Sequence, residues 1–502
     1  MNNIKEFISK AKKFYDEKNF FDARTQLLQA LQTNQIEEKL KLTLYYLIAD
    51  ICYKINDFIN SENYLLKYIE IDKSNPKIFN FLGNVCLKKR DYEKSEKFYL
   101  EAINLDSENE NAHINLALLY QNLGKQKKAV QLYEKIFKNN PQNIGSLYNL
   151  SNINKAAINK KNILELKKLI KTKKLNNFNM ASSYFLLAEN EKNRKGSSNE
   201  IDLLKKANDY SFKVNENINR QSNKYWLQII PNRFNKINYI KEIGLNRNEN
   251  LFPIFIIGLP RCGSTLIESI ISSGKEQIEN LGETNLVNWA FLNTNRNLLF
   301  SSEKLSEKKK IEINIEETAR KLEGAINGLK IYKDDSKNIF SEKSLENFYY
   351  IELILNIYPN AKFLNPYRNL IDNTLAIYKQ FLSNISWSHS IENILLYIDN
   401  HLRAVDFFKK KYPEKIFSIS LENLTKNPKP ISMEIYKFCD LKWDEKCLEF
   451  YKRDDLFSNT ASNNQIRASV QKYDHKKYES YRQILKDYQK KYNWIITDYL
   501  EV

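Results

Sequence analysis

Apolar and small side chains recur at a fixed spacing in the first part of the chain. One block carries Leu82, Gly83, Asp91, Tyr92, Ser95, Tyr99 and Ala102. Residues 34 positions later are Leu116, Ala117, Lys125, Gln126, Ala129, Tyr133 and Ile136, and those 34 earlier are Ile48, Ala49, Asp57, Phe58, Ser61, Leu65 and Tyr68. Small residues stand where two helices must approach closely, and large ones where they fill the space between. The period predicts a series of helical hairpins.

This period and pattern resemble the tetratricopeptide repeat, a helix–turn–helix unit. Three consecutive copies in register favour a repeat over an ordinary amphipathic helix pair. An earlier copy begins at Phe20, and degenerate copies follow near Leu147 and Ala181. One unit cannot bury its own apolar face, so several must stack. We therefore expect a helical solenoid over residues 1–215, whose concave surface offers a place for a protein or peptide partner.

The second half of the chain follows another pattern. A continuous apolar run at Phe252–Ile257 is typical of a buried parallel strand, and a helix is predicted over Thr265–Ser272. The alternation continues with strands at Ala361–Asn365 and Ile416–Ser420 and helices at Leu370–Phe381 and Ile391–Lys410. Strands that alternate with helices predict a parallel α/β sheet. The expected organisation is a solenoid at 1–215, a linker at 216–249 and an α/β domain at 250–502.

Composition narrows the class of protein. The formal net charge is +17, which favours acidic partners, although a coding bias toward Lys, Asn and Ile explains the overall charge more simply. Five scattered Cys without a C-x-x-C pair, and four dispersed His, argue against a disulfide framework and a metal site. The polar start and the short apolar run Leu251–Pro260 predict no signal peptide and no membrane span. We expect a cytoplasmic protein.

The segment Gly258–Thr265 joins the first predicted strand to the first helix of this half. Four of the 11 Gly in the chain lie between residues 258 and 282. Backbone N–H groups of such a loop, with the positive end of the following helix, form an anion cradle. The spacing is that of a P-loop, but Ser264 stands where a nucleotide triphosphatase has Lys, and Arg261 lies inside the loop. The loop therefore fits an anion with one phosphate and modest extra charge better than a metal-bound triphosphate.

Pro260–Leu266 resembles the 5′-phosphosulfate loop of sulfotransferases that use 3′-phosphoadenosine 5′-phosphosulfate (PAPS). Further segments that resemble the family follow in its order: Glu279–Glu283, Phe340–Phe348, Tyr367–Tyr378, Ser420–Leu424 and Thr460–Arg467. They cover roughly residues 250–485 and are closest in pattern to the tyrosylprotein-like and repeat-bearing sulfotransferases. The resemblance implies a P-loop-like α/β sulfotransferase domain behind the tetratricopeptide-like solenoid.

The resemblance also implies roles for particular residues. It gives catalytic roles to Glu283 as the base, Lys343 at the bridging oxygen of PAPS, and Arg261 at the phosphosulfate. The residues that it assigns to PAPS binding are Pro260, Arg261, Cys262, Gly263, Ser264, Thr265, Arg368, Ser462 and Arg467. Arg368 would bind the 3′-phosphate. No metal is expected.

Three positions depart from the family's pattern. Ala376 replaces a Ser of the 3′-phosphate motif, Ile371 replaces a second Arg, and Glu342 replaces the Asp before the Lys. A lost hydrogen bond at Ala376 would weaken cofactor affinity by about 1–3 kcal/mol unless Thr374 or Arg467 replaces it.

Alternative interpretations remain open at this point. Glu283 can be a solvated surface carboxylate, and Cys262 a reactive thiol rather than a tolerated small residue. The whole chain can be a P-loop kinase or nucleotide triphosphatase, or a repeat scaffold whose second domain only binds. We expect an acceptor that is a peptide, glycan or lipid, and no nucleic-acid partner. Because the phosphate-binding segments all follow residue 250, we expect nucleotide binding to survive deletion of residues 1–215.

Overall fold

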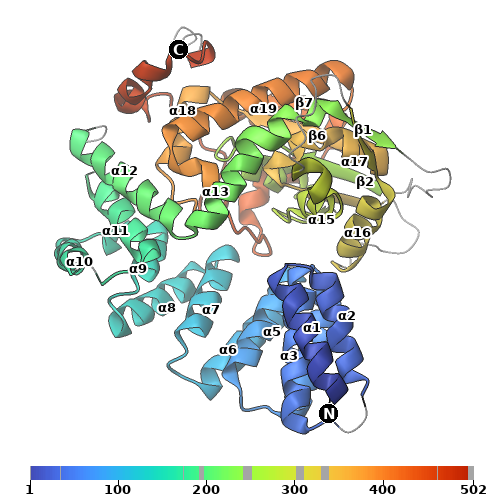
Figure 1. The fold of residues 1–502 in the computed structure, drawn as a ribbon. Helices are drawn as coiled ribbons and strands as arrows, with labels where there is room; N and C mark the ends of the chain where they lie inside the picture. The colour runs from blue at the N-terminus through green and yellow to red at the C-terminus, as the bar shows by residue number, and fades with distance from the viewer. Residues whose placement is uncertain are drawn as a thin grey trace. The chain divides into compact units, whose positions relative to one another are not determined.

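The computed structural model describes residues 2–33, 36–172, 174–191, 197–240, 251–276, 278–300, 310–329, 338–460 and 462–495. Its first part is built of helices in hairpins, coloured blue to green in Figure 1. These helices are α1 Asn2–Asp16, α2 Phe20–Leu31, α3 Glu38–Lys54, α4 Phe58–Ile71, α5 Pro76–Lys88, α6 Tyr92–Leu105, α7 Glu110–Asn122, α8 Gln126–Asn139, α9 Ile144–Ile153, α10 Lys160–Lys171, α11 Asn177–Asn190 and α12 Ser198–Lys213. The predicted helical repeats are confirmed.

The turn inside each hairpin shows how the sequence period becomes structure. Asn56, Arg90 and Gly124 stand 34 residues apart, and each has a positive φ of 60°, 64° and 74° respectively. Only glycine adopts this left-handed backbone without a steric penalty. The next residue is the N-cap of the following helix, and in two of the three repeats it is an aspartate, Asp57 or Asp91, whose side chain accepts from a backbone N–H of the first turn. The sharp turn therefore lays the two helices of a repeat against each other.

The helices of a repeat meet closely, as the small residues predict. The Ser95 hydroxyl on α6 donates to the Gly83 carbonyl on α5 at 2.8 Å, and Ser61 does the same to Ala49 one repeat earlier at 2.9 Å. A Cβ on Gly83 would lie 2.4 Å from the Tyr99 ring, which is fully buried. Gly83 therefore leaves the space that the Tyr99 ring occupies.

A five-stranded parallel sheet organises the second part of the chain, with strand order β3-β5-β2-β6-β7. Its strands are β2 Leu251–Ile256, β3 Glu279–Asn280, β5 Asn338–Glu342, β6 Lys362–Tyr367 and β7 Ile416–Ser420; a separate parallel pair is β1 Ile237–Ile240 with β4 Ile311–Asn314. The helices are α13 Glu216–Lys224, α14 Ser264–Ile271, α15 Leu286–Phe300, α16 Glu316–Asn327, α17 Ile351–Ile357, α18 Leu370–Tyr378, α19 Ile391–Lys411, α20 Leu421–Lys426 and α21 Pro428–Phe438.

The buried faces explain why these strands form. Ile254, Phe255 and Ile256 of β2 are all at most 2% exposed, as a central strand covered on both faces requires. Ile254 and Ile256 share a core with apolar residues of α14, β6, β7 and α21. The predicted strands and helices of this half are present, each within a few residues of its expected bounds. The predicted α/β fold with a parallel sheet is thus confirmed.

Internal contacts divide the chain into two compact units. The first comprises residues 1–121, 127–132 and 322–333, and the second comprises 122–126, 133–321 and 334–502. Helices α9 to α12 thus belong to the same unit as the sheet. The described part of 216–249 holds α13, short helical turns and β1; residues 241–249 lie outside the described part of the chain. The domain boundaries at 215 and 250 stay predictions. Within the described residues, no helix is both long and apolar enough to cross a bilayer.

We predict that Gly83→Ala destabilises the full-length protein by about 1–3 kcal/mol, because the new methyl group overlaps the buried Tyr99 ring. Gly324→Ala is the matched control. This glycine lies in α16 with nothing within 4 Å of a new Cβ, so the change is expected to stabilise by about 0.5–1 kcal/mol. Denaturant unfolding of both variants measures the difference, and equal effects would contradict the close approach at Gly83.

Candidate active site

The loop between β2 and α14 has the backbone of an anion-binding turn. Gly258, Arg261 and Gly263 have positive φ values of 135°, 68° and 96°. The φ of Gly263 favours glycine, and a Cβ there would also lie 2.6 Å from Leu421 Cδ1. No side chain caps the start of α14 at Gly263, which leaves the helix N-terminus to a ligand. The predicted phosphate loop therefore has the required conformation.

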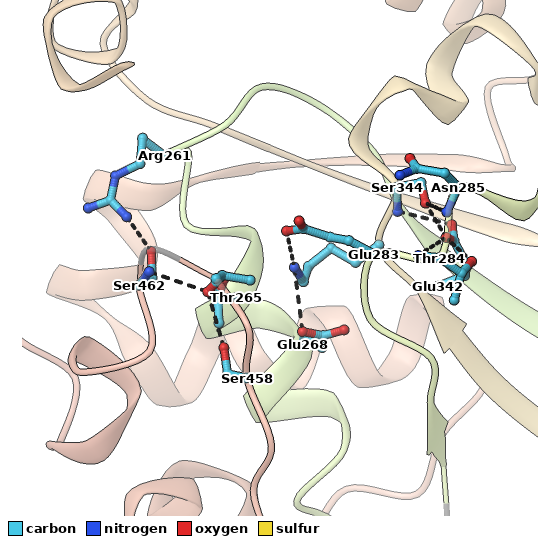
Figure 2. Close-up of polar contacts among 12 residues, drawn as sticks. Arg261, Thr265, Glu268, Glu283, Thr284, Asn285, Glu342, Ser344, Ser458 and Ser462 are labelled. Atoms are coloured by element: carbon cyan, nitrogen blue, oxygen red, sulfur yellow. Dashed lines mark hydrogen bonds and ion pairs between the residues drawn. The ribbon is translucent and has the colours of Figure 1, made fainter. Parts of the chain in front are cut away.

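A late loop of the chain meets this phosphate loop. An Arg261 guanidinium N–H donates to the Ser462 hydroxyl at 2.7 Å, as Figure 2 shows. The hydroxyl oxygens of Thr265 and Thr460 form a hydrogen bond at 3.1 Å. The hydroxyl oxygens of Ser458 and Thr460 form another at 3.1 Å. Burial lowers the pKa of Arg261, because the charged form loses hydration. A bound anion would compensate that cost.

A buried ion-pair cluster lies beside the phosphate loop. Lys343 Nζ donates to Glu283 Oε1 at 2.7 Å and lies 3.7 Å from Glu268 Oε2 on α14. The ammonium thus forms ion pairs with two carboxylates, Glu283 and Glu268, both labelled in Figure 2. Burial lowers the pKa of Lys343, but the two carboxylates outweigh burial and raise it. Lys343 is fully buried, whereas the Glu283 side chain is 41% exposed and so reachable by a second molecule.

Glu342 holds the backbone on either side of this cluster. Its carboxylate accepts from the Thr284 hydroxyl at 2.8 Å, from Ser344 N at 3.0 Å and from Asn347 Nδ2 at 2.6 Å. It also accepts from Thr284 N at 3.3 Å and from the Ser344 hydroxyl. These bonds join the segment after Glu283 to the segment after Lys343 (Figure 2). Glu342 thus fixes the spacing of two predicted catalytic side chains.

Arg368 lies in an aromatic and acidic setting. Its Nε and Nη2 donate to the Tyr473 hydroxyl at 3.1 and 2.6 Å, and its Nη1 donates to the Arg261 carbonyl at 3.3 Å. The Tyr473 hydroxyl in turn donates to Asp372 Oδ2 at 2.6 Å, and Arg482 Nη2 lies 3.9 Å from Asp372 Oδ1. The structure therefore brings Arg368 to the phosphate loop, with a second cation nearby from the C-terminal segment.

The residues at and around two of the departures from the family's pattern have other partners in the structure. Ile371 and Ala376 are buried, and the Thr374 hydroxyl donates to Leu370 O of its own helix at 2.8 Å. Arg467 Nη2 donates to the Asn122 carbonyl at 2.9 Å and to the Leu456 carbonyl. Neither Thr374 nor Arg467 is therefore directed to Arg368.

The remaining predicted site residues lie in the loop itself. Asn373 Nδ2 donates to the Pro260 carbonyl at 2.7 Å and so ties the loop to α18. Cys262 is fully buried, and burial raises the pKa of its thiol, which favours a small packing residue over a reactive one. Ser264 and Thr265 form the first turn of α14. The structure thus brings every predicted binding residue together except Arg467.

Sequence reasoning missed several residues of the site: Glu268, Glu346, Ser458, Thr460 and Tyr473. Glu268 lies four residues after Ser264 in α14. Residues at this spacing share one face of a helix, so Glu268 lies on the same face of α14 as the loop residue Ser264. Burial raises the pKa of Glu346 to about 8, with repulsion from Glu342 and Glu283 adding to it. Tyr473 has no local signal. Among the described residues, no three His, Cys, Asp or Glu side chains form a group suited to hold a metal ion.

Comparison with known proteins agrees with this geometry. The family model described as "Sulfotransferase family" matches residues 253–445, and the tetratricopeptide repeat model matches 42–75, 76–109 and 110–143. Residues 42–143 thus match tetratricopeptide repeats, and residues 253–445, which hold most of the parallel sheet, match the sulfotransferase family. An uncharacterized protein of Aquifex aeolicus strain VF5 is 25% identical over 312 residues, which cover 61% of this chain and 40% of that relative. The chain therefore spans well under half the length of this relative.

Solved structures similar to each part were also found. The sulfotransferase domain of the Synechococcus PCC 7002 olefin synthase is 14% identical over 48% of this chain and 91% of that domain, with a TM-score of 0.35. The sulfotransferase domain of the curacin biosynthetic pathway is 14% identical over 47% and 96%, with a TM-score of 0.28. MamA is 18% identical over 32% and 96%, with a TM-score of 0.29.

We predict that Glu342→Gln lowers stability by about 1–3 kcal/mol, because an amide N–H₂ then faces donors that the carboxylate satisfied. Amide hydrogen exchange at Thr284 and Ser344 is expected to accelerate together. Glu445→Gln, in an exposed pair with Lys429, serves as the control and is expected to leave both amides unchanged. If hydrogen exchange at both amides is unchanged in Glu342→Gln, then Glu342 does not hold these two segments together.

The raised pKa of Glu346 gives a prediction about pH. Its ordinary value is 4.5 and its folded value about 8, so between these pH values the unfolded chain ionises first and stability falls as pH rises. Glu346→Gln removes this loss, so its melting temperature relative to the wild type is expected to rise from pH 5 to pH 8.5. Thermal scans of both proteins across this range measure it. If the difference in melting temperature between Glu346→Gln and the wild type stays constant with pH, the raised pKa of Glu346 is contradicted.

Proposed function

We propose that this protein is a sulfotransferase that moves a sulfuryl group from PAPS to a hydroxyl, or an amine, of an acceptor. The observation that carries the proposal is the position of Lys343, between Glu268 on the helix of the phosphate loop and Glu283. A cation beside an anion cradle, with an accessible carboxylate against it, is the combination that sulfuryl transfer needs.

The residues present fit the two ends of the donor. The loop 258–263 with Arg261 and Ser462 suits the 5′-phosphosulfate, because backbone N–H groups and a guanidinium all donate to oxygens. Arg368, whose Nη1 reaches the Arg261 carbonyl, suits the 3′-phosphate at the neighbouring edge. Two guanidinium groups this close repel each other, and a dianionic ligand relieves that repulsion.

The transfer requires a base, a cation and alignment. The bond between sulfur and the bridging oxygen of PAPS breaks as the acceptor oxygen bonds to sulfur, and adenosine 3′,5′-bisphosphate leaves. Glu283 takes the acceptor proton. Lys343 stabilises the negative charge that grows on the leaving oxygen, which matters most in the transition state. Arg261 and Ser462 hold the group in line between the two oxygens.

The finer assignment rests on the resemblance of particular segments. Glu279–Glu283 and Phe340–Phe348 are similar to segments of the tyrosylprotein-like and repeat-bearing sulfotransferases, and we place the domain with them. The repeats would bind a protein or peptide, and the acceptor is a peptide, glycan or lipid. A cytoplasmic location is consistent with the five Cys, all of which are free thiols.

Ligand-induced stabilisation tests the donor. Adenosine 3′,5′-bisphosphate at about 100 times its Kd is expected to stabilise the protein by about 2.7 kcal/mol, whereas magnesium-ATP leaves the melting temperature unchanged. ATP is expected to bind poorly because Ser264 stands in place of the P-loop Lys. The bisphosphate is expected to bind because Arg368 is placed to contact its 3′-phosphate. Arg368→Ala is expected to reduce the shift. Equal shifts with both nucleotides would favour a nucleotide triphosphatase instead.

Turnover tests the assignment of the base. With labelled PAPS and a panel of peptides, glycans and lipids, Glu283→Gln is expected to lower kcat about 10²–10⁴-fold and to leave the affinity for adenosine 3′,5′-bisphosphate unchanged. Glu276→Gln, a nearby exposed carboxylate that accepts from Lys442 N, is the matched control. Wild-type turnover by Glu283→Gln would place the base elsewhere.

A further inference from the structure

The late loop that carries Ser462 has little structure of its own. Among its described residues, 458–460 and 462–467, the regular structure is one short helical turn, Gln465–Arg467. Its internal backbone hydrogen bonds join residues three or four positions apart: Asn463 N to Thr460 O at 3.0 Å, Gln465 N to Ser462 O at 2.9 Å, Ile466 N to Ser462 O at 3.4 Å and Arg467 N to Asn464 O at 3.4 Å. Such bonds shape a turn but do not place it. The position of Ser462 therefore depends on what the loop contacts.

Bonds to the helical repeats of the same compact unit anchor both ends of this loop. Ser458 N and Arg467 Nη2 both donate to the Asn122 carbonyl, at 3.0 and 2.9 Å. Between these two points, Asn464 Nδ2 donates to the Asn152 carbonyl on α9 at 2.6 Å. Both acceptors, the carbonyls of Asn122 and Asn152, are backbone atoms of repeat helices. Their positions are therefore fixed by the helices α7 and α9 to which they belong.

Repeat helices α9, α11 and α12 also contact the end of α18, the helix that follows Arg368, and the residues just after it. Phe381 stacks on Phe185 of α11 with ring centroids 5.2 Å apart and meets Tyr148 of α9 edge-on at 5.5 Å. Asn208 Nδ2 on α12 donates to the Tyr378 carbonyl at 3.0 Å. Helices α9, α11 and α12 thus contact the segments on both sides of the donor site.

We propose that the repeat helices are a positioning element of the donor site: through Asn464 and Arg467 they hold the loop 458–467 so that Ser462 meets Arg261. The inference rests on the proposed function. Arg467, predicted from the resemblance to bind PAPS, is in this view an anchor, because its guanidinium donates to the carbonyls of Asn122 and Leu456. Asn464 is the positioning residue closest in sequence to Ser462.

A consequence concerns the deletion of residues 1–215. That deletion removes both Asn122 and Asn152, so the loop loses its anchors although every predicted phosphate-binding segment remains. We therefore expect the deletion to weaken binding of the 5′ end of the nucleotide, whereas the sequence alone predicted only that nucleotide binding survives it.

The test measures what a 5′-phosphate adds to binding by the full-length protein. Calorimetry gives the Kd of adenosine 3′,5′-bisphosphate and of adenosine 3′-monophosphate, and their ratio isolates the contribution of the 5′-phosphate. In Asn464→Ala this ratio is expected to fall about tenfold, the worth of one good hydrogen bond, while the Kd of the 3′-monophosphate stays the same. Asn464→Asp, which sets a carboxylate against the Asn152 carbonyl, is expected to reduce the ratio at least as far.

The matched control is Asn154→Ala, an exposed residue two positions from Asn152 whose side chain accepts only from Ala156 N among the described contacts. It is expected to keep the wild-type ratio. Hydrogen exchange over residues 458–467 is expected to accelerate in Asn464→Ala and not in Asn154→Ala.

The outcomes separate the two proposals. If the wild type binds neither nucleotide, the donor assignment fails and this inference fails with it. If the wild type shows the 5′-phosphate advantage and Asn464→Ala keeps it, only the positioning role is overturned. Equal weakening of both nucleotides in Asn464→Ala would also overturn it, because that pattern reports general loss of structure rather than a displaced Ser462.

Discussion

The buried ammonium of Lys343 is the interaction on which the site depends. A fully buried charge is costly unless partners compensate it, and here two carboxylates from separate elements do so. Glu268 comes from the helix after the phosphate loop, and Glu283 from the segment after β3. Satisfying one cation therefore brings the anion cradle, the cation and an accessible base into one place. Glu342, immediately before Lys343, adds hydrogen bonds that keep the two backbones at this separation.

On the other side of the site, two cations, Arg261 and Arg368, lie near each other. Burial lowers the pKa of Arg261, and the nearby charge of Arg368 lowers it further. Tyr473 and Asp372 offset part of this cost on the Arg368 side, through a hydroxyl that accepts from Arg368 and donates to Asp372. An arrangement that is electrostatically unfavourable without an anion gives binding energy to a ligand that supplies one. This electrostatic argument supports the proposed binding of a doubly phosphorylated nucleotide.

The repeats and the sheet are built by different rules, and one loop contacts both. The repeats are set by local geometry: a left-handed turn residue, a cap and a small residue at the helix crossing. The sheet places its ligand groups at the carboxyl ends of β2, β5 and β6, as parallel sheets do. The loop 458–467 belongs to neither pattern, and it takes its position from backbone carbonyls of the repeats.

The sequence by itself determined the features that depend on residues close together in the chain. The repeat period, the strand before the phosphate loop and the helix after it could all be predicted, because periodicity and turn chemistry act within tens of residues. The resemblance to a family then indicated Glu283, Lys343 and Arg368. Only the tertiary structure decided which partners these side chains meet: Glu268 beside Lys343, Tyr473 beside Arg368, and Asn122 rather than the phosphate loop beside Arg467. The last two contacts join residues 105 and 345 positions apart, and pairs so distant share no local pattern, because packing of the whole chain selects them.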